Sequence, residues 1–347
     1  MSKAVRAKSA KGPFTRRTKL ILVSVIAIAI VLALVAVEYQ PTKKAKPNGN
    51  NNGNGDRPPA SGDWLVEKAI TVETENLVVN GNITINANGK LWLRNSTLQA
   101  SCHKGMTFRV VDGGELHILH SEITHSEPET QCDLWVEGTS KLEMKDSKST
   151  VILVLTADGA VVEKNIFTGK YAGILVYSDS NVISGNTITG SDSPFLANAI
   201  YLANVTKNAI SNNQLSGFGS GITLINASGN TFTRNSITSN NANGQVTGSG
   251  IQFDRSNDNT ITYNNITGCE QGVSLLNSTN NLFHHNNFKN NQKQVQDDGT
   301  NRFDDGTNGN YWSDYIGFDL NKDGKGDLPY LISFTDRDNH PLIKPVP

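Results

Sequence analysis

Short runs of alternating apolar residues, separated by Asn and Gly, recur along most of the chain. A pattern of Asn-x-hydrophobic-x-x-Asn-x-hydrophobic returns in segments that begin at Ala160, Asn181, Asn208, Asn230, Asn259 and Asn281, with Ala in place of the first Asn in the first segment. The apolar positions lie two apart, as in strands, and not three or four apart, as in helices. Each repeat of about 22 residues therefore contains about three short strands.

The first half of the chain carries a related unit. Segments beginning at Gly89, Gly114 and Ser140 recur with the same alternation, at spacings of 25 and 26 residues. Nine such rungs between about residues 75 and 297, at roughly 4.8 Å each, give a column of about 43 Å. The fold class predicted from the repeat is all-β, a parallel β-solenoid, with polar loops leaving the coil at 189–198 and 239–249.

Asn and small residues mark fixed places within each repeat. Asn tolerates the left-handed backbone conformation that bends require, and Asn side chains at the same bend in successive rungs can form a ladder of amides. A small residue followed by a hydrophobe, as in Gly173-Ile174 and Gly221-Ile222, precedes each later unit. We therefore expect Ile, Val, Leu and Phe side chains of successive rungs to form one continuous core.

The N-terminal segment differs from the repeats. Residues 1–19 are basic and contain no acid, whereas residues 20–37 contain no charge at all and would span roughly 27 Å as a helix. This predicts a single-pass transmembrane helix, a signal-anchor with a cytoplasmic N-terminus, because the basic residues are denser before the span than after it. A long cleaved signal peptide is the alternative. Either interpretation places the folded part outside the cell or in the periplasm.

Residues 38–63 are rich in Asn, Gly and Pro and predict a disordered linker between the membrane and the folded body. The body divides into a β-helix over 64–297 and a cap over 298–347. The net charge of the whole chain is −1, from 31 Lys and Arg against 32 Asp and Glu, so we expect no nucleic-acid partner.

The cap joins an aromatic cluster to an acidic loop. A solenoid exposes an apolar cross-section at its last rung, so we expect the aromatic residues that follow it to form a lid: Tyr311, Trp312, Tyr315, Phe318, Pro329 and Tyr330. The loop places oxygen ligands at spacings that suit Ca²⁺: Asp319, Asn321, Asp323, the Lys325 carbonyl and Asp327. Position twelve is Tyr330 where a bidentate Glu is usual, so another acid would complete the shell: Asp314, Asp336 or Asp338. The alternative is an Asx-turn loop that needs no ion.

The repeat and the tail together resemble a known family. The repeat resembles right-handed parallel β-helix proteins of the pectate-lyase-like superfamily, and the tail DDGTNGNYWSDYIGFD, with DGKGDLPY after it and DRDNHPL from Asp336, is similar to the end of NosD proteins, described as periplasmic copper-binding, and related prokaryotic surface proteins. The resemblance implies an exported right-handed β-helix that handles carbohydrate or metal.

Copper would need imidazole or soft sulfur ligands. The histidines that lie near one another in the sequence are His117 and His120 in one rung, with His125 following nearby, and His284 with His285 at a bend. Because isolated surface histidines commonly bind nothing, copper is not expected as the cofactor, and a NosD-like copper-handling accessory role is an alternative function.

A polysaccharide lyase or glycoside hydrolase would need acids or bases on an exposed strand. Asp254 and Arg255 form the only close acid–base pair within a rung, with Asp179 and Asp192 in earlier rungs. No Ser-His-Asp set, P-loop or dinucleotide motif accompanies them. Single solvated charges explain these residues better, so catalysis is left open and is not the favoured interpretation.

The favoured function is binding of a polysaccharide or other glycan, or of a cell-envelope protein, by the outer walls of the column. The aromatic residues considered for this role are Tyr171, Tyr177, Tyr201 and Phe253. Convergence of Asp179, Asp192 and Asp254 in one groove would instead favour an enzyme.

Cysteines and sequons complete the candidate positions. Cys102 and Cys132 are candidates for a disulfide between neighbouring loops, with Cys269 as a buried thiol. The candidate glycosylation sites are the Asn residues of six sequons: Asn82, Asn95, Asn204, Asn226, Asn265 and Asn277.

Overall fold

The computed structural model describes residues 56–101, 107–126, 131–169, 172–190, 198–238 and 248–347. The predicted transmembrane segment, Cys102, Tyr171 and Asp192 lie outside these ranges, as does the linker before residue 56. Within these ranges, no helix is long and apolar enough to cross a membrane.

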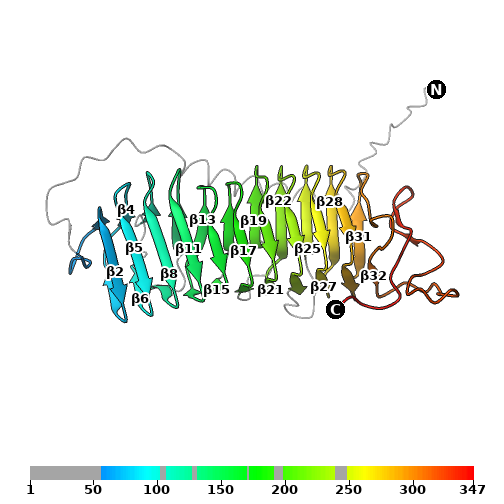
Figure 1. The fold of residues 1–347 in the computed structure, drawn as a ribbon, viewed down its shortest axis with the longest axis horizontal. Coiled ribbons are helices and arrows are strands. Elements are labelled where there is room, and N and C mark those ends of the chain that lie inside the picture. The colour runs from blue at the N-terminus through cyan, green and yellow to red at the C-terminus, as the bar shows by residue number, and fades with distance from the viewer. Residues whose placement is uncertain (1–55, 102–106, 127–130, 170–171, 191–197, 239–247) are drawn as a thin grey trace, which may run out of the picture. The chain divides into compact units, whose positions relative to one another are not determined.

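The chain winds through three parallel sheets in turn, so that consecutive strands belong to different sheets (Figure 1). Sheet A contains β1 (Trp64–Val66), β4 (Ile83–Ile85), β7 (Phe108–Val110), β10 (Asp133–Val136), β13 (Ile152–Leu155), β16 (Ala172–Val176), β19 (Asn198–Ala203), β22 (Ser220–Ile225), β25 (Ser249–Asp254), β28 (Gln271–Leu276) and β31 (Lys293–Asp297). Sheet B contains β2 (Ala69–Glu73), β5 (Lys90–Arg94), β8 (Glu115–Leu119), β11 (Lys141–Lys145), β14 (Val161–Glu163), β17 (Val182–Ser184), β20 (Ala209–Ser211), β23 (Thr231–Thr233), β26 (Thr260–Thr262) and β29 (Leu282–His284). Sheet C contains β3 (Asn76–Val79), β6 (Thr97–Ala100), β9 (Glu122–His125), β12 (Lys148–Ser149), β15 (Ile166–Gly169), β18 (Thr187–Gly190), β21 (Gln214–Ser216), β24 (Ser236–Thr238), β27 (Asn265–Thr267), β30 (Asn287–Lys289) and β32 (Tyr311–Trp312). A short antiparallel C-terminal hairpin, β33 (Tyr330–Leu331) with β34 (Arg337–Asp338), follows.

The predicted all-β parallel solenoid with three strands per rung is confirmed. The coil includes β1, which starts at Trp64 and pairs in parallel with β4, although the repeat becomes recognisable in the sequence only from about residue 75. In each sheet, residues that pair across strands share a face, and the inward row of sheet A is apolar throughout, for example Ile200, Ile222 and Ile251. The inward rows of all three sheets form one core.

Two ladders of buried Asn side chains run along the coil inside its bends. In the second ladder, Asn235 Nδ2 donates to Asn264 Oδ1 in the next rung and to the Ile210 carbonyl, at 2.9 Å each. Asn235 Oδ1 in turn accepts from the backbone N–H and the side-chain amide of Asn213, at 3.0 Å each. Earlier in the column the serines Ser96, Ser121 and Ser147 occupy the same ladder. The predicted amide ladder is thus confirmed.

The Asn residues with left-handed backbone form a separate set from the ladder. Among the described residues with positive φ are the Asn residues Asn95, Asn204, Asn212, Asn226, Asn277, Asn280 and Asn290. These are exposed or partly exposed turn residues, whereas no ladder Asn is in this set. The single role predicted for Asn at the bends therefore divides between two positions, one for hydrogen bonding inside and one for backbone conformation outside.

The small residue before each sheet A hydrophobe lies where sheets C and A meet. A Cβ atom on Gly221 would lie 2.4 Å from Ile237 Cγ2 of sheet C, and one on Gly250 would lie 2.5 Å from Ile266 Cγ2. These positions need a small residue because a core isoleucine fills the corner.

The last rung is covered by stacked aromatic rings. Trp312, which is buried, lies between Phe288 of β30 at 4.4 Å and Tyr330 of the hairpin at 4.3 Å, both nearly parallel to it. Tyr315 meets Tyr330 edge to face at 6.4 Å. The aromatic lid predicted for this end is confirmed in these residues, but Phe318 is 53% exposed and lies outside the stack.

Candidate functional site

Sheet A has an outer face that is shielded from water over its middle strands. Strand alternation places Val154, Tyr201, Thr223 and Gln252 in one outward row on β13, β19, β22 and β25. Val154 is 0% exposed, Tyr201 6% and Thr223 5%. The matching outward row of sheet B, from Trp92 to Leu282, is at least partly exposed at every position. The middle of sheet A therefore differs from the outer face of sheet B in the described column, because its outward side chains are largely shielded from water.

Two tyrosines on neighbouring rungs are the main feature of this face. The rings of Tyr177, just after β16, and Tyr201, on β19, lie 5.9 Å apart and tilted by 58°. Burial raises the pKa of Tyr177 to about 12, with a further contribution from the Asp133 carboxylate. The pKa of Tyr201 is also raised, first by burial and then by Tyr177 and Asp254. The tyrosine pair thus lies between two acids, Asp133 on β10 and Asp254 on β25.

Asp254, at the end of β25, is the acid with the most unusual surroundings. It is 8% exposed, and its Oδ2 forms an ion pair with Arg255 Nη2 at 2.9 Å. Its Oδ1 is buried and has no hydrogen-bond partner. Arg255 is itself positioned by Asn226 Oδ1, which accepts from Arg255 Nε at 3.0 Å. A buried carboxylate oxygen without a donor is costly, so it is a natural acceptor for a ligand hydroxyl or N–H.

The remaining residues predicted to act or stack on this face do not join Tyr177, Tyr201 and Asp254. Asp179 belongs to a turn, where its Oδ1 accepts from the Thr206 N–H at 2.6 Å, so it holds two rungs together. It lies three rungs before Asp254, which corresponds to about 14 Å along the column. Phe253 was expected on the outer wall, but this is wrong: it is 0% exposed in the core, because it pairs with Leu224 on the inward row. Asp192 and Tyr171 lie outside the described residues.

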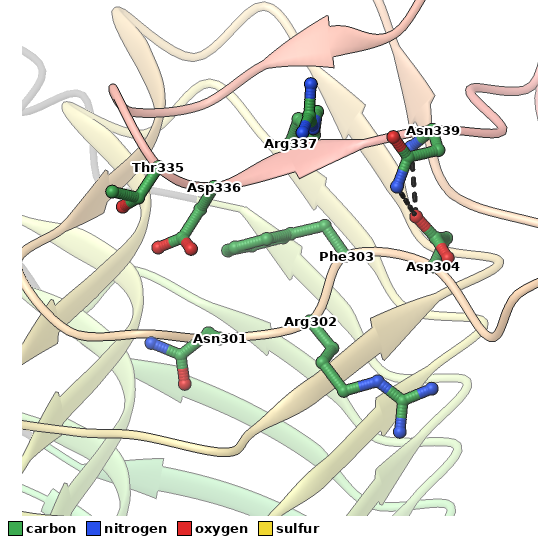
Figure 2. Close-up of a pocket in the computed structure, with 8 residues that line it drawn as sticks. All are labelled: Asn301, Arg302, Phe303, Asp304, Thr335, Asp336, Arg337 and Asn339. Carbon is green, nitrogen blue, oxygen red and sulfur yellow. Dashed lines mark hydrogen bonds between the residues drawn. The ribbon is translucent and has the colours of Figure 1, made fainter.

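A polar pocket of about 240 Å³ lies between the last coil and the C-terminal hairpin. Figure 2 shows Asn301 and Asp336 on either side of this space, with Asn339 bonded to Asp304 at its far end. Asp336 is 6% exposed and its Oδ2 has no hydrogen-bond partner. The repeat pattern gives no sign of this pocket, and the sequence predicts Asp336 only as a candidate calcium ligand.

Asp336 faces a second acid, Asp297, at the end of β31. The pKa of Asp297 is raised to about 6, mainly by burial and also by the nearby Asp336 carboxylate. Hydrogen bonds from Gly299 and Asn301 favour the charged form and oppose this increase. The two side chains thus form a pair of like charges beside the pocket.

The loop expected to bind calcium is closed by its own amides. Asp319 accepts from the N–H groups of Asp323 and Gly324, at 3.1 and 2.9 Å, and Asp323 accepts from the Lys325 N–H at 2.9 Å. Asp327 accepts from the Leu320 N–H at 2.7 Å.

None of the three acids expected to complete the calcium shell is available without rearrangement. Asp314 accepts from the Tyr330 hydroxyl, and Asp336 lies beside Asp297. Asp338 accepts from Asn310 N–H, Trp312 Nε1 and His340 N–H at 2.7 to 2.9 Å. The loop residues fit an ion in type and spacing, but the remainder of the shell is not gathered around them.

The histidines that the sequence places near one another fall into two groups: His117, His120 and His125 have separate surroundings, whereas His284 and His285 lie together. His117 stacks on Trp92 at 5.3 Å, and its Nδ1 lies 3.1 Å from Glu143, while His125 Nδ1 lies 2.9 Å from Thr150 Oγ1. His120 occupies a left-handed turn. Among the described residues, three metal-ligating groups come together in one place only, at His284, His285 and Asp305.

The two described cysteines differ in bonding state, and the sequon Asn residues differ in exposure. Cys132 is disulfide-bonded, and Cys269 is buried with its thiol 3.6 Å from the Thr267 carbonyl. Four of the six sequon Asn residues are exposed in left-handed turns: Asn95, Asn204, Asn226 and Asn277. Asn82 bonds to Asp63, and Asn265 is partly buried within β27. Glycosylation stays a prediction.

Residues 139–308 match the family model described as "Right handed beta helix region". The fold is a right-handed parallel β-helix, as the resemblance implied, whereas the more specific NosD relationship stays a prediction. No curated protein matches the chain.

Among solved structures, a mutant of the periplasmic alginate epimerase AlgG has 15% sequence identity over 69% of this chain and 65% of its own, with a TM-score of 0.43. AlgG itself has 14% identity over 68% of this chain and 66% of its own, with a TM-score of 0.35. The chain spans just under two thirds of the length of these epimerases.

Proposed function

We propose that the outer face of sheet A binds a carbohydrate chain. The observation that carries this proposal is the buried Asp254 Oδ1, which has no hydrogen-bond partner and lies near the tyrosine pair of Tyr177 and Tyr201 on an outward face. Sugars present hydroxyl groups that donate to such an oxygen and apolar ring faces that pack on aromatic rings.

The rest of the row supports a long, uncharged ligand. Beyond Tyr201 the outward positions on successive rungs are Thr223, Gln252, Ser274 and Gln296, which are polar but uncharged. Thr223 Oγ1 is already oriented, since it donates to Asn198 Oδ1 at 2.7 Å. A row of hydrogen-bonding groups repeated about every 4.8 Å suits an extended polymer better than a compact metabolite.

A carbohydrate-active enzyme is the second candidate, favoured by the same Asp254 oxygen. Glycoside hydrolases place two carboxyl groups about 5 to 9.5 Å apart. Asp179 and Asp254 are separated by about 14 Å, and Asp133 and Asp254 lie five rungs apart, or about 24 Å. These pairs are too widely spaced for that chemistry. Asp254 with Arg255 would instead have to act as a single base beside a cation, as in a polysaccharide lyase.

The experiment is a binding titration of the full chain against a panel of neutral and anionic polysaccharides. Tyr177→Ala and Asp254→Asn should each weaken binding about tenfold, which corresponds to about 1.4 kcal/mol. The matched controls are Trp92→Ala, an aromatic residue on the outer face of sheet B, and Asp146→Asn in an exposed turn, and both should bind as the parent does. Equal loss in the controls, or binding only to an envelope protein, would contradict the proposal. Release of shortened or unsaturated product would move the assignment to the enzyme.

The proposal includes a membrane anchor and an extracellular or periplasmic body, on the basis of the uncharged segment 20–37 and the basic residues before it. Protease added to intact cells, or to cells with a permeabilised outer membrane if the body is periplasmic, should remove the β-helix and leave the N-terminal tail protected. Fractionation of the full chain with soluble proteins would contradict the anchor.

A structural calcium ion in the loop of Asp319 to Asp327 also belongs to the proposal, supported by the spacing of its oxygen ligands. Binding would require the loop carboxylates to exchange some of their amide hydrogen bonds for the ion. Chelation with EDTA should then lower the melting temperature, and an unchanged melting curve would leave an Asx-turn loop that needs no ion.

A further inference from the structure

The last turn of the coil departs from the repeat at one point. In five consecutive rungs the two ladder Asn residues are five positions apart, as in Asn259 with Asn264 and Asn281 with Asn286. In the final partial rung they are Asn301 and Asn310, nine positions apart, yet both still accept from the preceding rung. Four extra residues are thus inserted at the bend, and they form a loop beside the end of β29.

This inserted loop brings a carboxylate to two adjacent imidazole rings. His284 Nδ1 lies 2.7 Å from His285 Nδ1 and 3.6 Å from Asp305 Oδ2. All three ligand atoms lie within 4.8 Å of one another. Two unprotonated Nδ1 atoms would repel each other at 2.7 Å. One of the two Nδ1 atoms must therefore carry a proton that it donates to the other, unless a cation lies between them.

Two of the three side chains, Asp305 and His285, are held by their surroundings. Asp305 accepts from the N–H groups of Thr307 and Asn308 at 2.8 and 2.7 Å. His285 stacks on Tyr263 at 4.8 Å, and Tyr263 is covered in turn by the Arg234 guanidinium at 4.8 Å. These residues occupy the same left-handed turn position in three successive rungs. The stacking fixes the plane of the imidazole before any ion binds, which is what supporting groups do in metal sites.

The surroundings of the site also admit a cation. Arg302 is the positive charge near His284, and Asp305 opposes it. The His284 side chain is 18% exposed and that of Asp305 is 29% exposed, so an ion can reach them from solvent.

We propose that His284, His285 and Asp305 form a binding site for one divalent transition-metal ion of the Zn²⁺ type. Imidazole nitrogen and carboxylate oxygen are ligands of Zn²⁺ at about 2.0 to 2.2 Å, so tetrahedral ligands lie roughly 3.4 Å apart. The observed separations of 2.7 and 3.6 Å lie on either side of that value. Small rotations of the two rings would bring them to it. The ion would tie the inserted loop to the last complete rung.

The test is calorimetric titration of the untagged full chain with Zn²⁺ in excess Ca²⁺, which occupies sites made only of oxygen ligands. Cobalt(II) provides a second readout, because its visible absorption reports nitrogen coordination. His285→Asn keeps a residue that tolerates the left-handed turn, and Asp305→Asn keeps an acceptor for the loop amides. We expect one Zn²⁺ per parent chain and at least about tenfold weaker binding in each variant.

The matched control is His120→Asn, which changes a histidine in another left-handed turn and should bind Zn²⁺ as the parent does. Far-UV circular dichroism and metal-free melting must be the same in all four proteins, and His284→Gln replaces any variant that fails this criterion. A parent chain that takes up no Zn²⁺ would overturn the site. So would equal binding by the parent and by the variants of His285 and Asp305.

Discussion

At the scale of single residues, the fold depends on polar side chains that are completely buried and completely bonded. Each ladder Asn within the column links three successive rungs through its amide, so the ladder converts a buried polar group from a cost into a continuous set of hydrogen bonds. Among the described carboxylates, Asp254 and Asp336 are exceptions, since each has a buried oxygen without a hydrogen-bond partner. These exceptions are where the column has polar capacity to offer a ligand.

Asn235→Ala tests the ladder. The change removes the acceptor for two Asn213 donors and the donor to the Ile210 carbonyl, so we expect a loss of about 3 kcal/mol in the free energy of unfolding. Gln214→Ala, an exposed outward position on β21, is the control and should change stability little. Urea denaturation measures both. A loss below 1 kcal/mol, taken as about the net value of a single hydrogen bond, would show that the ladder is not cooperative.

The carboxyl pair of Asp297 and Asp336 predicts a dependence on pH. The folded-state pKa of Asp297 is raised to about 6 from an ordinary value of 3.8, so the folded protein binds more protons than the unfolded chain between these values. Stability from this group is therefore present at low pH and falls as the pH rises from about 4 to above 6.

Asp336→Asn removes the like charge and provides an amide donor for Asp297. We expect the variant to exceed the parent in stability by about 1 kcal/mol at pH 8, after allowance for solvent screening of the partly buried Asp297, and to match it at pH 5. Denaturation at the two pH values measures this. An advantage of equal size at both values would mean that charge repulsion is not the cause.

At the scale of elements, the strands follow directly from the alternation of residues, whereas the terminal structures do not. The inward row through Ile200, Ile222 and Ile251 could be predicted because a period of two fixes the face of every residue in a strand. The same rule should have placed Phe253 inside, since it lies two residues after Ile251. The meeting of Asp305 with His284 could not be predicted, because it depends on the path of an inserted loop.

The cap is the element whose contribution to stability is easiest to isolate. Trp312→Ala removes the ring stacked between Phe288 and Tyr330 and should cost about 4 kcal/mol, as for other buried aromatic residues. Phe334→Ala is the matched control, because Phe334 is fully exposed in the same part of the chain. Thermal unfolding monitored by circular dichroism compares them. Equal melting temperatures for the two variants would show that the aromatic stack does not seal the column.

At the scale of the whole molecule, the three sheets differ in use although they share one repeat. Sheets B and C leave most of their outward residues in contact with water, whereas apolar, aromatic and acidic outward residues in the middle of sheet A are shielded from water. The sequence indicated individual residues of this face, such as Tyr201 and Asp254, but not their association. Their association depends on how strands from separate rungs align, which the spacing of repeats gives only approximately.

Hydrogen–deuterium exchange of the full chain, with and without a saturating oligosaccharide from the polysaccharide panel, tests the central claim most directly. We predict slower exchange in β16, β19, β22 and β25, around Tyr177, Tyr201 and Asp254, with no change in the sheet B strands of the same rungs. Protection confined to sheet B or to the C-terminal hairpin, or no protection at saturation, would contradict the assignment of sheet A as the carbohydrate-binding face.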